Sequence, residues 1–176
     1  MADQKEVWQG RLALSTAIMA VLAALTSLYL GKYSSRAIMS QGQESDQWAF
    51  YQAKSIKEHA FEISRTQLEL QMQAQQGLGG EASQAYRATV DRYKNEIQRY
   101  ENERKDIKAK AEEIAKRKLK AQEMGGNFAY ALIFLQIALM LSSISSLTKR
   151  KYLWHIALIA TIGWLFFFVD AWLLFY

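Results

Sequence analysis

Apolar residues gather in three long, almost uncharged stretches, and a long polar region separates the first from the second. The stretches are 12–31, 128–147 and 152–176, and Asp170 is the one charged side chain within them. About 20 apolar residues span the hydrocarbon core of a bilayer as an α-helix. The pattern predicts an all-α membrane protein with three transmembrane helices rather than a soluble protein with three buried core helices.

The segments beside these stretches complete the expected organisation. Residues 1–11 form an N-terminal tail, and residues 148–151 form a short basic loop between the second and third spans. The first stretch is longer than the apolar core of a cleavable signal peptide, so we expect a retained anchor. Because the chain has no proline, we expect one helix to continue from the first span into the polar region.

The polar region, 32–127, is rich in the strong helix formers Ala, Glu, Lys, Gln and Arg. A glycine cluster at 77–80 leaves segments of equal length on either side, 32–76 and 81–125. Two helices joined by a short turn form an antiparallel helical hairpin, which would return the chain to the membrane. We therefore predict a long extramembrane coiled-coil hairpin with its turn at 77–80.

A heptad repeat marks the core of this hairpin. Apolar positions kept at a 3-4 spacing over several heptads are typical of a coiled-coil seam. Folding about the glycines pairs Tyr93 with Ile63 and Tyr100 with Ile56. Tyrosine can bury its ring while its hydroxyl stays in water, so we favour core packing over a ligand-stacking or redox role. The predicted core residues are Ile56, Ile63, Leu70, Tyr86, Val90, Tyr93, Ile97, Tyr100, Ile107 and Ile114.

Small residues recur every three or four positions along one face of the first predicted helix. Small side chains let two helix backbones approach closely, and in lipid such packing drives helix association. We therefore predict that this small-residue stripe is a seam for assembly, either in a homo-oligomer or with another membrane protein subunit. Its residues are Ala13, Ala17, Ala20, Ala24, Ser27, Gly31, Ala49 and Ala53.

The segment SDQWAFYQAKSIK, residues 45–57, places three aromatic residues within four helical positions. Trp48 and Tyr51 lie one turn apart and too far beyond the first span for the aromatic belt of a membrane interface. We expect them to anchor in a neighbouring subunit, the alternative being that they complete the core of the hairpin itself. The candidate partner contacts are Asp46, Trp48, Phe50, Tyr51, Lys54 and Phe61.

The same segment carries a resemblance to a known family. One apolar span before it, a long charged helix after it and a C-terminal pair of spans resemble a family of uncharacterised bacterial membrane proteins, domain of unknown function 4337. The resemblance covers nearly the whole chain and implies a bacterial origin and a membrane location, but no reaction. This chain differs from histidine-rich relatives in having only His59 and His155, which argues against a metal-handling role.

Composition and motifs narrow the function classes. The net charge of +5 is modest and the polar region mixes both signs, so we predict no binding of nucleic acid. The chain has no cysteine, which excludes disulfides and thiolate metal sites. It has no phosphate-binding loop, nucleophile elbow or His-Glu metal pair. We expect no catalytic residue, no cofactor and no metal, and therefore no enzyme.

Among the polar residues in the predicted spans, Asp170 is the strongest candidate for a functional role. Carboxylates within a membrane are energetically costly and are often functional, which makes Asp170 a candidate for transport or proton relay. Its position six residues before the end of the sequence equally allows the carboxylate to reach the lipid headgroups.

Basic residues predict the orientation in the membrane. Short basic loops stay in the cytoplasm, so we expect Lys149–Lys151 and the N-terminus on that side of a bacterial inner membrane. The hairpin would then be periplasmic. The basic residues at 116–120, close to the second span, argue for the opposite orientation, but the rule gives more weight to short loops than to long domains.

These features together predict a non-enzymatic oligomeric scaffold whose partners are membrane lipid and further copies of the chain. One alternative is an accessory subunit of a larger membrane complex. Another is an oligomeric channel whose pore is lined by the first span, with Ser15, Thr16, Thr26 and Ser27 facing water.

Overall fold

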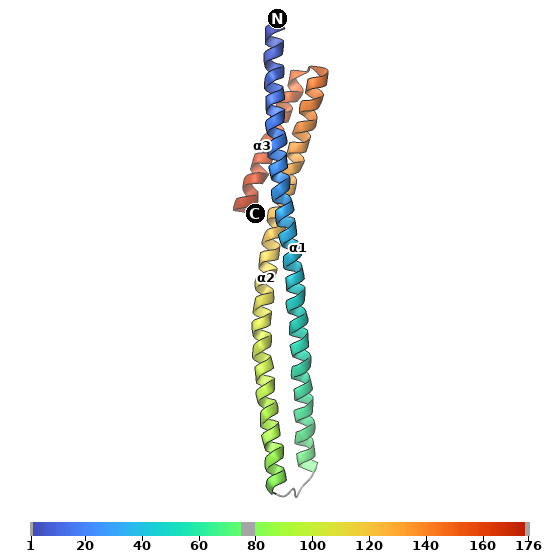
Figure 1. Ribbon diagram of the computed structural model, residues 1–176, viewed down its shortest axis with the longest axis vertical. Helices are drawn as coiled ribbons and strands as arrows, with labels where there is room; N and C mark the ends of the chain where they lie inside the picture. The colour runs from blue at the N-terminus through green and yellow to red at the C-terminus, as the bar shows by residue number, and fades with distance from the viewer. Residues whose placement is uncertain (1, 75–79, 175–176) are drawn as a thin grey trace. The chain divides into compact units, whose positions relative to one another are not determined.

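The computed structural model describes residues 2–74 and 80–174, which form three α-helices. They are α1 (Ala2–Ala74), α2 (Gly80–Thr148) and α3 (Lys151–Leu173), and the described residues contain no strand (Figure 1). Each helix includes a stretch that is long and apolar enough to cross a membrane, judged by length and composition. The prediction of an all-helical chain with three long apolar helices is confirmed. The predicted turn at 77–80 lies outside the described residues except for Gly80, where α2 begins.

Two helices continue from polar sequence into apolar sequence without interruption. α1 contains the whole first apolar stretch and extends far beyond it, and α2 passes through Gly125 and Gly126 as a helix. The link from α2 to α3 is short: Lys149 adopts a left-handed backbone conformation (φ 54°) and Arg150 is extended. The Ser145 hydroxyl donates to the Arg150 carbonyl at 2.9 Å, which satisfies one backbone acceptor of the link.

The chain divides into two compact units. One consists of residues 1–39 and 117–176, and the other of residues 40–116. The boundaries fall within α1 and α2, beyond the ends of the apolar stretches, so each unit has its own packed interior.

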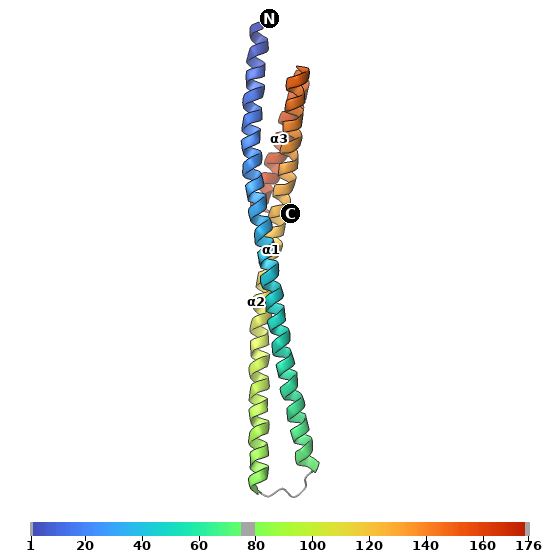
Figure 2. The ribbon, with the colours of Figure 1, turned by 45° about the vertical axis from the view of Figure 1, so that its right-hand side comes forward.

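The unit of residues 1–39 and 117–176 packs the apolar parts of all three helices together. Figure 2 shows α3 folding back beside the end of α2. One buried cluster joins Met19 of α1, Leu135 and Ala138 of α2, and Ala157 of α3. The buried residues of α2 keep a seven-residue spacing, as a coiled-coil seam does. They are Ala121, Phe128, Leu135 and Ser142 in one row and Met124, Ala131, Ala138 and Ser145 in the other.

Aromatic rings fill a second cluster in this unit. Phe128 is fully buried and stacks on Tyr29 and Tyr33 of α1, with ring centroids 5.4 and 5.6 Å apart. Trp172 and Phe168 of α3 meet the same phenyl ring edge-on. Gly125 of α2 lies beside α1 in this unit, since a Cβ there would make ordinary contacts of 3.8 Å with the Tyr33 Cβ and the Ser34 backbone nitrogen.

The unit of residues 40–116 brings polar segments of α1 and α2 into contact. Phe61 of α1 lies between two tyrosines of α2, with ring centroids 5.5 Å from Tyr93 and 5.8 Å from Tyr100. The inner positions of α1, buried or half-buried, follow a regular 3-4 spacing. They are Tyr51, Lys54, Glu58, Phe61, Arg65, Leu68 and Met72.

This inner face corrects the predicted pairing. Ile56, Ile63 and Leu70 are 69%, 59% and 58% exposed, so their assignment to the core of the hairpin is wrong. The prediction followed the most aliphatic row of α1, whereas the inner row combines the Phe61 ring with Lys54 and Glu58, which pair with charged residues of α2. On α2, Val90, Tyr100 and Ile114 are buried, and Tyr86, Tyr93, Ile97 and Ile107 are half-buried.

Candidate functional site

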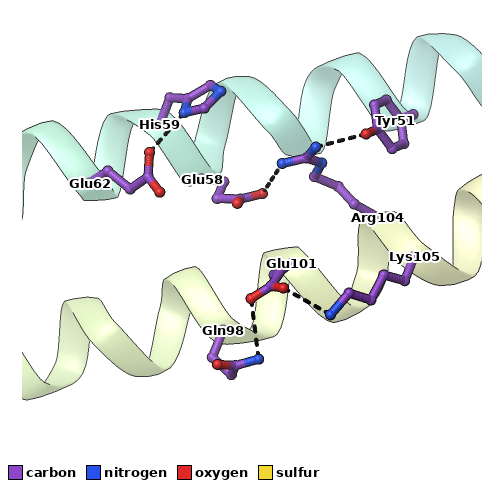
Figure 3. A network of polar contacts seen from close by, with 8 residues as sticks. All are labelled: Tyr51, Glu58, His59, Glu62, Gln98, Glu101, Arg104 and Lys105. Atoms are coloured by element: carbon purple, nitrogen blue, oxygen red, sulfur yellow. Dashed lines mark hydrogen bonds and ion pairs between the residues drawn. The ribbon is translucent and has the colours of Figure 1, made fainter.

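A network of hydrogen bonds and ion pairs within residues 40–116 is centred on Arg104 (Figure 3). The guanidinium extends from α2 to α1, where it donates to the Glu58 carboxylate at 2.6 Å and to the Tyr51 hydroxyl at 2.7 Å. The same guanidinium lies over the Tyr51 ring, 4.8 Å from its centroid. Burial of Glu58 to 7% exposure makes this an ion pair shielded from water.

Other charged residues surround the Arg104 site. Lys54 forms an ion pair with Glu103 across the two helices, and Lys105 donates to Glu101 at 2.8 Å within α2. Hydrogen bonds from Lys54 and Lys105 lower the pKa of Glu103 and of Glu101, respectively. Hydrogen bonds to Tyr51 and Glu58 raise the pKa of Arg104 above its ordinary value.

These shifts keep Glu101, Glu103 and Arg104 ionised at neutral pH. Proton-transfer catalysis needs a group whose pKa lies near the working pH, whereas the groups with shifted pKa values here move away from neutrality. The arrangement therefore clamps α1 to α2 in one register. The sequence did not single out Glu58, because an isolated glutamate in a charged helix looks like a solvated residue.

The candidate partner contacts fall into two groups. Tyr51 and Lys54 bind α2 residues and Phe61 packs on α2 tyrosines, so these three belong to the interior of their own chain. These contacts favour the alternative that the three residues complete the core of the hairpin, and their contact with a neighbouring subunit stays a prediction. Asp46, Trp48 and Phe50 are exposed. For these three, partner contact stays a prediction.

The small-residue stripe faces away from the helices of its own chain. All of its residues, from Ala13 to Ala53, are exposed. The face that packs within residues 1–39 carries instead Leu12, Met19, Thr26 and Tyr33, all buried. A Cβ added at Gly31 would meet no atom within 4 Å. Close packing along this stripe is therefore available to another helix.

Asp170 lies on the face of α3 that packs against the rest of its unit, and it is 3% exposed. The Asn127 amide donates to its carboxylate at 2.7 Å, and its own backbone carbonyl accepts from the Leu174 N–H at 2.7 Å. The expected alternative, a side chain reaching out to headgroups, is wrong because the carboxylate points into the packed unit. A hydrogen bond offsets part of the cost of burying a charged group. The sequence analysis missed Asn127, which lies just before the second apolar stretch.

Most of the polar residues in the first apolar stretch that were proposed to line a pore form hydrogen bonds within the chain. The indole N–H of Trp164 donates to the Thr26 hydroxyl at 3.0 Å, and that of Trp154 donates to the Ser15 hydroxyl at 3.0 Å. Thr16 donates to the carbonyl of Leu12 at 2.8 Å. Of the four residues proposed to line a pore, Ser27 is the exposed one.

Metal-ligating side chains do not gather in the described part of the chain. Within residues 2–74 and 80–174, no group of three or more His, Asp or Glu residues could hold a metal ion. His59 Nδ1 lies 2.8 Å from a carboxylate oxygen of Glu62, one turn along the same exposed helix face.

The fold and these contacts define an all-helical protein with three helices long and apolar enough to cross a membrane, a combination that suggests a membrane protein. The chain belongs to the family described as Domain of unknown function (DUF4337), whose family model matches residues 8–174. The match includes the first two apolar stretches whole and the third as far as residue 174. No curated protein and no solved structure was found to match the chain.

Proposed function

We propose that the protein is a non-enzymatic scaffold of a bacterial inner membrane, assembled from several copies of the chain. Its three apolar helices would span the membrane, with lipid as their surroundings. Residues 40–116 would form an antiparallel coiled-coil hairpin outside the membrane. The scaffold role requires neither a cofactor nor nucleic acid.

The observation that carries this proposal is the exposed small-residue stripe. A helix that merely faces lipid has no need of small side chains, since leucine is as compatible with lipid tails as alanine. Small residues instead serve close helix–helix contact. Here Ala20, Ala24 and Gly31 are exposed, whereas the large residues Leu12 and Met19 supply the contacts within the chain.

Contacts within residues 40–116 support the antiparallel direction of the hairpin. Position 58 of α1 meets position 104 of α2, and position 61 meets positions 93 and 100. Later residues of α1 thus meet earlier residues of α2, as they do in a hairpin whose turn follows α1.

We propose the periplasmic side for the hairpin, from the short basic loop Lys149–Lys151. The chain has no cysteine, so single cysteines can report sidedness. A membrane-impermeant thiol reagent applied to cells with a permeable outer membrane should label Lys94→Cys and spare Lys151→Cys. Labelling of Lys151→Cys alone would place the hairpin in the cytoplasm.

Two alternatives differ in the identity of the neighbour. An accessory subunit would use the same stripe against a different protein. A channel lined by the first span is disfavoured, because Thr26 is fully buried and accepts a hydrogen bond from Trp164. Ser15 is likewise occupied by Trp154.

The experiment that separates the first two is purification from the native membrane in a mild detergent, with the mass and composition of the particle measured together. A particle containing several copies of this chain alone supports the scaffold. A particle in which one copy accompanies other proteins supports the accessory role, and a lone monomer contradicts both.

A further inference from the structure

The outer face of α1 within residues 40–116 is apolar and uncovered by α2. We define this outer face by eight positions at 3-4 spacing, all of them exposed. They are Ala49, Ala53, Ile56, Ala60, Ile63, Gln67, Leu70 and Ala74. This face extends for about 39 Å at 1.5 Å per residue. A single hairpin therefore leaves a second seam unused beside the one that it buries.

Charge is distributed unevenly between the two helices of this unit. None of the eight outer-face positions of α1 carries a charged side chain. Between positions 49 and 74, Lys57 is exposed, Glu58 is buried, and the other charged residues are half-buried as whole residues, although the side chains of Glu62 and Glu69 are 43% and 42% exposed. The exposed surface of α2 is densely charged instead. It carries Arg87, Asp91, Arg92, Lys94, Arg99, Lys105, Asp106, Lys108, Lys110, Glu112, Glu113 and Lys116. Depletion of charged residues is typical of the centre of a protein interface, so α2 is suited to water and the outer face of α1 to a partner.

We propose that the outer face pairs with the same face of a second copy, as a parallel and in-register coiled coil. This inference rests on the proposed membrane scaffold, because two chains anchored in one membrane send their α1 helices in the same direction. Identical positions then form successive layers, in which Ile56, Ile63 and Leu70 are separated by Ala60 and Gln67. A face without charge is complementary to itself, and a symmetric dimer uses one patch twice.

Gln67 provides the argument for a second copy rather than an unrelated helix. It occupies a seam position between Ile63 and Leu70, where an apolar partner would leave its amide without a hydrogen bond. An amide carries both a donor and an acceptor, so two facing Gln67 side chains can satisfy each other. A single polar residue at such a position is a known means of fixing register and copy number in parallel coiled coils.

Disulfide cross-linking of the full-length chain in its membrane tests this pairing. Ala60 on the outer face and Ala109 on α2 are both exposed alanines, so Ala60→Cys and Ala109→Cys are matched single substitutions in a cysteine-free chain. A disulfide requires Cα atoms within about 7 Å. Under copper–phenanthroline oxidation, Ala60→Cys should give a covalent dimer with a yield about tenfold above that of Ala109→Cys.

A second variant and a mixed pair test register and direction. Gln67→Lys places two like charges face to face, which should lower the Ala60→Cys dimer yield about tenfold or more. Chains carrying Ala53→Cys should not link to chains carrying Ala74→Cys, because parallel pairing holds these positions about 30 Å apart.

Three results would overturn the inference: an Ala60→Cys yield no higher than that of Ala109→Cys, an efficient link between positions 53 and 74, or no effect of Gln67→Lys. If the purified particle still contains several copies of the chain alone in that case, the scaffold stands and only the pairing of the outer faces is lost.

Discussion

Arg104 and Glu58 form a charge-assisted hydrogen bond of 2.6 Å between α2 and α1, and their side chains are 23% and 9% exposed. The bond joins two residues far apart in the sequence. It holds one position of α1 opposite one position of α2. A ladder of apolar contacts tolerates sliding by a heptad more readily than a buried ion pair does, because sliding would leave both charges unpaired. The pair thus selects one register for α1 and α2.

Removing one partner of this pair should destabilise the protein. Glu58→Gln removes the carboxylate but keeps the size of the side chain, and it leaves Arg104 less well satisfied. We expect a loss of about 1.5–3 kcal/mol, the range for hydrogen bonds to charged groups. Thermal unfolding of the full chain in mild detergent, followed by circular dichroism, should show a Tm lower by several degrees.

Replacing both partners tests whether the charge pair itself stabilises. In Glu58→Met with Arg104→Met, no charge is left unpaired, so we expect stability within about 1 kcal/mol of the original chain. A double variant as unstable as the sum of its single changes would contradict this account of the site.

Acid should weaken the unit of residues 40–116. The pKa values of Glu101 and Glu103 are lowered in the folded chain by Lys105 and Lys54. A lowered folded pKa contributes stability above the unfolded value, about 4.3, and the contribution is lost as the pH falls through the folded value. Tm should therefore stay level from pH 7 to about 5 and fall below about 4.

The matched control for this acid effect is Lys54→Met combined with Lys105→Met, which removes the cation that lowers each pKa most. Its Tm should depend less on pH between about 5 and 3 than that of the original chain. An unchanged acid dependence would mean that other carboxylates cause it.

The helical class and the three apolar stretches could be predicted from the sequence, because they depend on the composition of each segment. Runs of about 20 apolar residues identify candidate spans, and the absence of proline allows long helices. The α2 seam could also be predicted from the sequence, since Val90, Tyr100 and Ile114 combine heptad spacing with large apolar side chains. All three are buried in the structure.

The face of α1 that packs on α2 could not be predicted from the sequence in the same way. It carries Tyr51, Lys54, Glu58 and Phe61, and only the partners on α2 show that Glu58 is buried and that Lys54 and Glu58 are paired. Hydropathy favours Ile56 and Ile63, which are exposed instead. A helix with two usable seams cannot be resolved by periodicity alone, because the choice depends on which cross-helix contacts satisfy the polar groups.

Gly163 should resist substitution because of a close neighbour. A Cβ at this position would lie 2.7 Å from Cδ1 of Phe134, whose ring is stacked on Phe167. Gly163→Ala must displace the ring, at a typical cost of about 1–3 kcal/mol. Gly126→Ala, with no atom within 4 Å of the new Cβ, should leave Tm unchanged or raise it. Equal Tm values for the two variants would contradict this packing.

Thr26 should matter through its hydroxyl. It is fully buried, donates to the Leu22 carbonyl at 2.7 Å and accepts from the Trp164 indole at 3.0 Å. Thr26→Val keeps the shape and leaves the indole N–H without this acceptor, so we expect a loss of about 0.5–2 kcal/mol. Thr26→Ser, which keeps the hydroxyl, should lose less. Similar Tm values for the two variants would show that the hydrogen bond contributes little.

The central claim, assembly through the small-residue stripe, is tested most directly by the mass of the full chain in mild detergent, measured by size-exclusion chromatography with light scattering. Ala20→Leu, Ala24→Leu and Gly31→Leu together add bulk to an exposed face without touching any packed residue, so Tm of the single chain should change little. Ser143→Leu places one leucine at an exposed position of α2 outside the stripe, and Ala20→Leu alone, also a single leucine, is its matched partner within the stripe. We predict an oligomer for the original chain and for Ser143→Leu, and a shift toward monomer for the triple variant. An oligomer of unchanged mass in the triple variant would contradict the claim.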